Sequence, residues 1–279
     1  SSRIYVIDTA KTPRAPSLHK VVEPTDILRK TGLAYPHTSH CLASGDIMVS
    51  CLGDKEGNAT GSGFLLLESD FNVKGRCSML QCTKKSLHNI CLFKVAISVT
   101  PLKVRNWILP EMPGLITDFL ISLDDRYLYF VNWLHGDVRQ YNIEDPSKPV
   151  LTGQVWVGGL LQKGSDVVYV AEDGTESQFS VPVIKGNRLR GGPQMIQLSL
   201  DGKRLYVTNS LFSVWDQQFY GRDFVKKGSH MLQIDVNTEQ GGLTINPNFF
   251  VDFGTEPEGP ALAHEMRYPG GDCTSDIWI

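Results

Sequence analysis

Histidine and cysteine are the residue types of this chain that most readily bind metals or transfer protons, and three of them lie together near the N-terminus. His37 and His40 are three residues apart, and Cys41 follows directly. Imidazole nitrogen and thiolate sulfur together suit copper or zinc. The two histidines converge on one metal if the chain turns, whereas on an extended strand they point to opposite faces. The alternative to a metal site is a pair of loop histidines that form hydrogen bonds to the backbone.

A second candidate lies in the short segment Trp133-Leu-His135-Gly136-Asp137. Gly136 permits a tight backbone turn. Asp137 is placed to accept a hydrogen bond from an imidazole and so to orient it as a metal ligand. The alternative is a turn histidine that packs beside Trp133.

A third candidate is His264, which Glu265 follows. A neighbouring carboxylate tunes the basicity of an imidazole or serves as a further ligand. The alternative is a contact by which the C-terminal segment closes a structural unit.

An internal repeat predicts the elements that carry these residues. Ser122-Leu-Asp-Asp-Arg-Tyr-Leu-Tyr129 matches Ser199-Leu-Asp-Gly-Lys-Arg-Leu-Tyr206, and the match continues to Asn132 and Asn209. The offset is about two units of roughly 40 residues, the size of a β-propeller blade. In each copy Asp-Asp or Asp-Gly supplies a tight turn before a strand. In the second copy Ser210–Val214 corresponds to the segment around His135 and contains no histidine, which favours a functional role for His135.

Further strands with acidic turns follow each copy, so we expect an all-β chain of strand-loop-strand units that stack on one another as in a β-propeller. A β-sandwich with coincidental turns is the alternative. We expect a single propeller-type domain over residues 1–279. Residues 77–93 have neither clean alternation nor turn residues and form an atypical segment. In a propeller, loops that carry the four histidines can converge on the central channel.

Composition narrows the class of protein. The chain has 27 basic and 30 acidic residues, well mixed, and a net charge of −3, so no nucleic-acid partner is expected. The chain contains no run of 18 apolar residues, so no membrane-spanning helix is expected. Ile4–Asp8 already has the pattern of a strand, so we expect an intracellular soluble protein without a signal peptide, with residues missing upstream.

Six cysteines without a C-x-x-C pair favour free thiols. Cys51 is expected in a strand core, and His19, His88 and His230 at the surface.

Five long segments resemble the family of selenium-binding protein 1, also called the methanethiol oxidase family. They are Leu33–Gly45, Leu109–Asp118, Asn132–Asp137, Gly191–Tyr206 and Gly259–Ile279. The resemblance covers residues 1–76 and roughly 94–279. It implies a seven-bladed propeller in the intact family, and oxidation of methanethiol by O2 and water to formaldehyde, hydrogen sulfide and hydrogen peroxide.

The resemblance also implies cofactors and partners. It implies copper, which makes His37, His40, His135 and His264 the expected metal ligands, with Cys41 and Glu265 as further cofactor-binding residues. It implies selenium bound by thiols, a small thiol substrate, protein partners and at most peripheral membrane association. A cytosolic location with nuclear and peripheral membrane pools is implied too, with a part in intra-Golgi transport. For a mechanism in which a metal binds the thiolate, Asp118 and Asp137 are the candidates for proton handling.

Two departures from the family pattern leave rival interpretations open. The family's N-terminal region, with a Cys-Ser-Ser-Cys motif and a paired-histidine motif, has no counterpart here, and a long central stretch is replaced by residues 77–93. The propeller is therefore expected to be incomplete, with open sheet edges. The rivals to an active oxidase are a non-catalytic propeller that binds selenium or protein partners, and a shortened, inactive member of an enzyme family.

Overall fold

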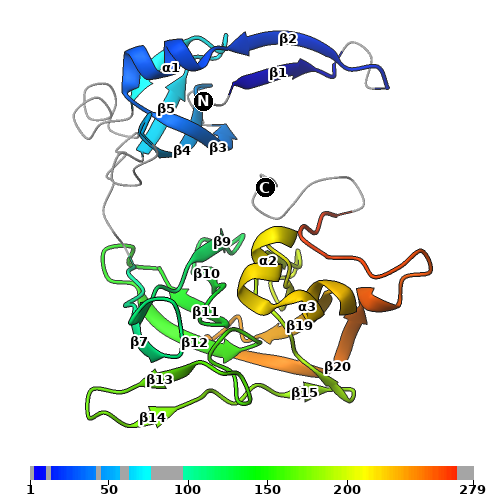
Figure 1. Ribbon diagram of the computed structural model, residues 1–279. Helices are drawn as coiled ribbons and strands as arrows, with labels where there is room; N and C mark the ends of the chain where they lie inside the picture. Colours follow the sequence, from blue (N-terminus) through cyan, green and yellow to red (C-terminus); the bar gives the residue numbers. More distant parts are fainter. Residues whose placement is uncertain (1–2, 11–13, 42–44, 57–62, 77–96, 269–279) are drawn as a thin grey trace. The chain divides into compact units, whose positions relative to one another are not determined.

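The computed structural model describes residues 3–10, 14–41, 45–56, 63–76 and 97–268 of the 279-residue chain (Figure 1). Its contacts divide the chain into two compact units, Ser1–Lys94 and Val95–Ile279. The expectation of one domain over residues 1–279 stays a prediction. Within the described ranges no helix has both the length and the apolar character needed to span a membrane.

The first unit contains a β-hairpin, a helix and one four-stranded antiparallel sheet. The hairpin is formed by β1 (Ile4–Asp8) and β2 (Ser17–Val22). Helix α1 (Pro24–Thr31) starts with proline, whose fixed φ suits a first helical turn, and ends at Gly32 in the left-handed conformation. The sheet contains, in chain order, β3 (Ala34–Cys41), β4 (Ile47–Gly53), β5 (Gly63–Leu67) and β6 (Val73–Arg76).

The core of the first unit lies between α1 and this sheet. Ile27 of α1 packs with Val49, Leu65 and Val73, and all four are nearly inaccessible to solvent. Cys51 belongs to the same cluster as a free thiol, 3% exposed, as the sequence predicted for a strand residue of the core. Burial raises the pKa of this thiol, which keeps it protonated.

The second unit is built on two further four-stranded antiparallel sheets in chain order. The first contains β9 (Ile116–Ile121), β10 (Tyr127–Asn132), β11 (Asp137–Asn142) and β12 (Val150–Trp156). The second contains β17 (Ile196–Leu198), β18 (Arg204–Thr208), β19 (His230–Val236) and β20 (Leu243–Asp252). Four antiparallel strands that follow one another in space as in sequence are the blade of a β-propeller. The predicted fold class, all-β and of the propeller type, is confirmed.

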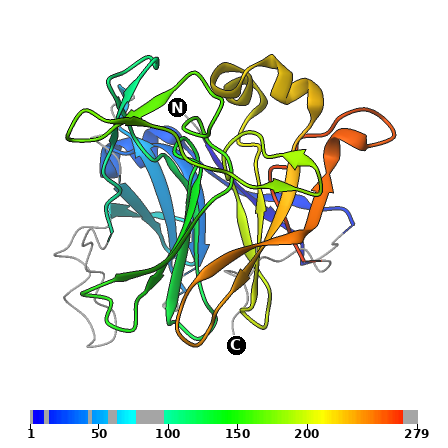
Figure 2. The same ribbon diagram turned by 90° about the horizontal axis from the view of Figure 1, so that it is seen from below.

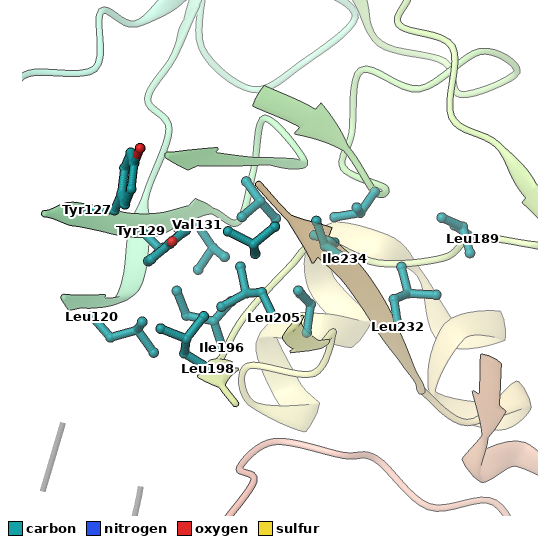
Figure 3. Close-up of a cluster of buried hydrophobic side chains, with 14 of the residues drawn as sticks. Leu120, Tyr127, Tyr129, Val131, Leu189, Ile196, Leu198, Leu205, Leu232 and Ile234 are labelled. Atoms are coloured by element: carbon teal, nitrogen blue, oxygen red, sulfur yellow. The ribbon is translucent and has the colours of Figure 1, made fainter. Parts of the chain in front are cut away.

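The two sheets of the second unit stand side by side and share one apolar core (Figure 2). Tyr129 and Val131 of β10 meet Leu205 of β18 and Ile234 of β19, and all four are fully excluded from water (Figure 3). These residues come from alternate positions of their strands, so one face of each sheet is buried against the other. Neither sheet can bury this face alone, which is why the repeat unit has to be stacked.

The internal repeat folds into the same turn twice. The hydroxyl of Ser122 donates to Asp124 (2.5 Å) and accepts from the amide of Tyr127 (2.9 Å). The hydroxyl of Ser199 donates to Asp201 (2.5 Å) and accepts from the amide of Arg204 (3.0 Å) in the second sheet. The fourth residue of the turn has a positive φ in both copies, 57° at Asp125 and 70° at Gly202. The predicted tight turns are therefore confirmed.

The remaining segments of the second unit join these blades. A third sheet of this unit is assembled from β7 (Leu102–Arg105), β8 (Glu111–Met112), β13 (Val168–Val170) and β14 (Glu176–Ser177). A short hairpin, β15 (Val183–Ile184) and β16 (Asn187–Arg188), leads toward β17. A 3₁₀ turn, η2 (Phe253–Thr255), follows β20.

Two helices, α2 (Ser213–Tyr220) and α3 (Arg222–Lys227), are inserted between β18 and β19, where the first repeat has only the residues 133–136 (Figure 1). They cover the end of the neighbouring blade. The rings of Phe219 and Tyr220 meet Trp133 edge-on at centroid distances of 5.3 and 5.0 Å. The buried hydroxyl of Tyr220 donates to the carbonyl of Trp133.

Candidate functional site

The C-terminal segment 261–268 lies across the ends of β18 and β19 and carries His264. The amide of Ser229 donates to the carbonyl of Ala261 (3.0 Å), and the amide of Ser210 donates to the carbonyl of Ala263 (3.2 Å). The hydroxyl of Thr208 donates to the carbonyl of His264 itself (2.8 Å). The backbone on both sides of His264 is therefore fixed to the second blade.

The ring of His264 is exposed but oriented. Its Nδ1 lies 3.1 Å from the carbonyl oxygen of Ser210. A carbonyl oxygen only accepts, so Nδ1 carries the proton in this contact. In the neutral ring Nε2 then holds the lone pair, which is the form that accepts a proton or binds a metal.

Asp118 of β9 faces the same region from the neighbouring blade. One carboxylate oxygen accepts from the amide of Ile196 (2.9 Å), the first residue of β17. Burial raises the pKa of Asp118 to about 6, the charge of Glu265 adds to this, and His264 opposes it. Asp118 on β9 thus lies within electrostatic range of His264 and Glu265 in the C-terminal segment, where Glu265 also forms an ion pair with Arg267.

A carboxyl group with a pKa near 6 beside an imidazole with an available lone pair is suited to transferring protons near neutral pH. An ordinary aspartate would remain ionised there, whereas Asp118 exchanges its proton close to neutrality. This place, formed by Asp118, His264 and Glu265, is called the inner-edge site below, because it lies where β9 and β17 begin.

His135 has a different environment. It is fully buried, and its Nε2 donates to the carbonyl of Met112 (2.9 Å). Its Nδ1 has no hydrogen-bond partner among the described residues. Burial lowers the pKa of this imidazole, so it is neutral at physiological pH. This environment is that of the turn histidine packed beside Trp133, the alternative considered in the sequence. The role of His135 as a metal ligand stays a prediction.

Asp137 does not form the predicted hydrogen bond to His135. One oxygen of its buried carboxylate accepts from the amide nitrogen of the Asn132 side chain (3.0 Å). The other accepts from Arg139 Nε (2.7 Å) and Gln154 Nε2 (2.6 Å). Three donors already satisfy the carboxylate, so its geometry is that of a group that holds strands β10, β11 and β12 together. The expectation that Asp137 orients the imidazole is therefore corrected, and its role in proton handling stays untested.

The first-unit candidates lie on a strand and not on a loop, which also corrects the expectation. His37, His40 and Cys41 belong to β3. The pairing of β3 with β4 shifts register between Pro36 and Ser39, which breaks the strict alternation of faces at His37. His37 is exposed, while the side chains of His40 and Cys41 lie outside the described residues.

His230 is a buried polar residue that the sequence placed wrongly at the surface. It is 1% exposed and stacks on Phe250. Its Nδ1 accepts from the side-chain amide of Asn209 (3.2 Å), and its backbone amide donates to the oxygen of the same side chain (2.8 Å). Burial lowers the pKa of His230 to about 3.

The repeat itself could have identified His230. Asn132 and Asn209 are matching residues at the ends of β10 and β18, and each donates to the first residue of the next strand. His230 is therefore the structural counterpart of Asp137. The sequence signal was the repeated asparagine, whose partner is separated from it by the inserted helices.

The described residues do not form a complete metal site. Nowhere among them do three or more histidine, cysteine, aspartate or glutamate side chains form a group that could hold a metal ion. The four predicted histidines also divide between the two units, His37 and His40 in the first, His135 and His264 in the second. No group of metal ligands is thus assembled among the described residues, and the chemistry of the inner-edge site is that of its own side chains.

Comparison with known proteins places this geometry in a family. The model of the 56 kDa selenium-binding protein family matches residues 1–90 and 77–279. The chain belongs to this family. The resemblance seen in the sequence is thereby confirmed.

Relatives within the family match the whole chain. Selenium-binding protein 3 of Arabidopsis thaliana is 56% identical, and methanethiol oxidase of Homo sapiens is 46% identical; the chain covers 78% and 79% of these proteins. The aligned region spans 374 positions, against 279 residues in this chain, so the relatives have at least about 95 positions without a counterpart here. That residues 77–93 replace family sequence stays a prediction.

A solved structure agrees with the fold. The hypothetical selenium-binding protein of Sulfolobus tokodaii superposes with a TM-score of 0.56 and 29% sequence identity, over all of this chain and 78% of that one. The family membership and the blade topology therefore rest on independent comparisons of sequence and of structure.

Proposed function

We propose that this chain oxidises methanethiol with O2 and water to formaldehyde, hydrogen sulfide and hydrogen peroxide. The observation that carries the proposal is its 46% identity, over the whole chain, to a protein named methanethiol oxidase. The reaction is balanced. The carbon of methanethiol gives up two electrons, and O2 accepts both to form hydrogen peroxide. Water supplies the oxygen of formaldehyde.

The inner-edge site supports this proposal because the reaction needs groups that accept protons. Methanethiol must lose its thiol proton and a proton from its methyl group as it is oxidised. Asp118, with a pKa of about 6, is able to accept a proton at neutral pH, and the Nδ1 contact of His264 leaves the lone pair of its Nε2 available. Glu265 adds negative charge beside them, which raises the proton affinity of Asp118.

Copper remains a separate proposal drawn from the family resemblance. Two substitutions test it, His135→Ala and His264→Ala, with copper per chain measured by elemental analysis of the purified protein. Loss of copper in a variant supports that residue as a ligand. Copper content equal to that of the unchanged chain would exclude it.

Selenium binding without catalysis is the second candidate function. It is favoured by the identity to selenium-binding protein 3 of Arabidopsis thaliana, which at 56% is higher than the identity to methanethiol oxidase. Selenium would be bound by thiols. Cys51 is not suited to that role, because it is buried and burial raises its pKa. The cysteines that would bind selenium are to be sought among the other five.

One experiment separates the two functions. The purified chain is incubated with methanethiol under air, and sulfide, formaldehyde and peroxide are measured together. Production of the three compounds in equal amounts, in proportion to protein, supports the oxidase. Retention of selenium by the protein after incubation with selenite, with none of the three products formed, supports the binding protein.

A further inference from the structure

The turn that follows β18 contains an acidic residue to which no role has been given. Asp216, in the first turn of α2, is fully buried. One of its oxygens accepts from the hydroxyl of Ser210 (2.6 Å), and the other accepts from the amide of Leu211 (3.1 Å). Its own amide donates to the carbonyl of Phe212 (2.8 Å). A single carboxylate therefore fixes the chain between β18 and α2.

This turn presents the group that orients His264. The carbonyl of Ser210 accepts from His264 Nδ1 (3.1 Å), while the amide of Ser210 donates to the carbonyl of Ala263 (3.2 Å). Ser210 thus contacts Asp216 through its side chain and the histidine segment through its backbone. Because Ser210 is only 3% exposed and its hydroxyl is held by the carboxylate, the carbonyl of the same residue has little freedom to turn away.

The burial of Asp216 is unfavourable for a charged group, and burial raises its pKa accordingly. A neutral residue would cap this turn at lower cost. The proximity of His264 opposes that rise. The buried carboxylate of Asp216 thus holds Ser210, and Ser210 in turn orients the exposed ring of His264.

We infer that Asp216 and Ser210 are positioning residues for His264: they hold the Ser210 carbonyl where it keeps the proton of the imidazole on Nδ1 and leaves the Nε2 lone pair to act on the thiol substrate. The inference rests on the proposed oxidase function for its consequence in catalysis. Its structural content, the control of the ring tautomer, stands independently of that function.

The test uses the whole chain labelled with ¹⁵N-histidine. The tautomer of each ring is determined from the nitrogen shifts and the two-bond couplings in the NMR spectrum, and the His264 signals are assigned by their loss in His264→Gln. Wild type is compared with Ser210→Ala and Asp216→Asn, which remove the hydroxyl and the charged acceptor. Ser210→Thr keeps the hydroxyl as the conservative variant. Asp223→Asn makes the same charge change on the exposed surface of α3 and serves as control.

We expect His264 to carry its proton on Nδ1 in wild type, Ser210→Thr and Asp223→Asn. In Ser210→Ala and Asp216→Asn the population shifts toward the Nε2-protonated form, and kcat for methanethiol falls about 10- to 100-fold, the usual effect of losing a residue that orients a functional histidine. A purely structural role would lower the yield of folded protein without changing the tautomer of the folded fraction.

Three results are decisive. An unchanged tautomer in both Ser210→Ala and Asp216→Asn overturns the inference. A shifted tautomer with unchanged kcat overturns its catalytic part. If the wild-type chain forms no products but the variants shift the tautomer, the proposed oxidase function fails while the positioning of His264 by Asp216 and Ser210 is supported.

Discussion

The histidines of this protein differ in burial and in hydrogen bonding. His264 is exposed and forms one oriented hydrogen bond, whereas His135 and His230 are buried and neutral. Burial penalises the charged imidazolium, so a buried histidine resists protonation until the pH is far below its ordinary pKa. This difference separates the histidine suited to proton transfer from the two that stabilise the blades.

His230 gives a prediction for stability against pH. Its pKa is 6.5 in an ordinary environment and about 3 in the fold. Between these values the unfolded chain binds a proton that the folded chain does not, so stability falls as the pH falls from 7 toward 3. For one such group the loss between pH 7 and pH 5 is about 2 kcal/mol. His230→Gln, which keeps an acceptor for Asn209, should show a smaller loss by about this amount in urea unfolding at the two pH values. Equal losses would contradict the account.

Asp137 gives a second prediction. Its carboxylate is fully buried and accepts from Asn132, Arg139 and Gln154. Asp137→Ala leaves the partly buried guanidinium of Arg139 unpaired, which costs about 3 to 5 kcal/mol of stability. Glu172→Ala, on the exposed surface, should change stability by less than about 0.5 kcal/mol. Guanidinium unfolding measures both, and a loss below about 1 kcal/mol for Asp137→Ala would refute the bridging role.

The residue types alone could identify the inner-edge site only in part. His264 and Glu265 were candidates from their residue types and Asp118 from the mechanism implied by the resemblance, but only the structure shows that the first two influence the pKa of Asp118. The mistaken surface position of His230 has a physical cause. Its burial depends on Asn209 and Phe250, which are distant in sequence and are brought to it only by pairing of the strands.

At the scale of elements, the turn 133–136 between β10 and β11 packs closely on the segment that follows β12. Gly136 has a φ of 93°, and its amide donates to the carbonyl of Asn132 (2.8 Å). A Cβ atom added to it would lie 2.1 Å from the carbonyl oxygen of Gly158. The glycine is therefore required both for its backbone conformation and for the approach of the next segment.

A matched pair of substitutions separates these two requirements. Gly174 has a similar φ of 83° but open space around an added Cβ. Gly174→Ala should cost only the strain of the left-handed conformation, about 1 to 2 kcal/mol. Gly136→Ala adds a backbone clash and should cost more than about 4 kcal/mol, or prevent folding. Similar melting temperatures for the two variants would show that the described close approach does not exist.

The repeat of strands could be predicted from the sequence because it is local: turn residues and alternating apolar positions recur at a fixed offset. The helices α2 and α3 were not predicted. Their apolar residues, such as Phe219 and Tyr220, pack on Trp133 of the other blade and not within a single amphipathic face. His37 was expected on a loop but lies in β3, where the shifted register accommodates the preceding Pro36.

At the scale of the whole molecule, three blade-type sheets with their strands in chain order are described, one in the first unit and two in the second. The fold class and the family could be predicted because both depend on long sequence segments. The number of blades that close the molecule depends on stacking between units, which no sequence segment specifies.

The pH dependence of methanethiol oxidation by wild type and Asp118→Asn tests the central claim most directly. Asp118 accepts a proton only when ionised, and its pKa is about 6, so the wild-type rate of sulfide release should rise as the pH increases through about 6. Asp118→Asn should lose this rise and at least about 100-fold in rate, the lower range for general base catalysis. Glu172→Gln should behave as wild type. A folded Asp118→Asn variant with the wild-type rate and the wild-type pH profile would contradict the account.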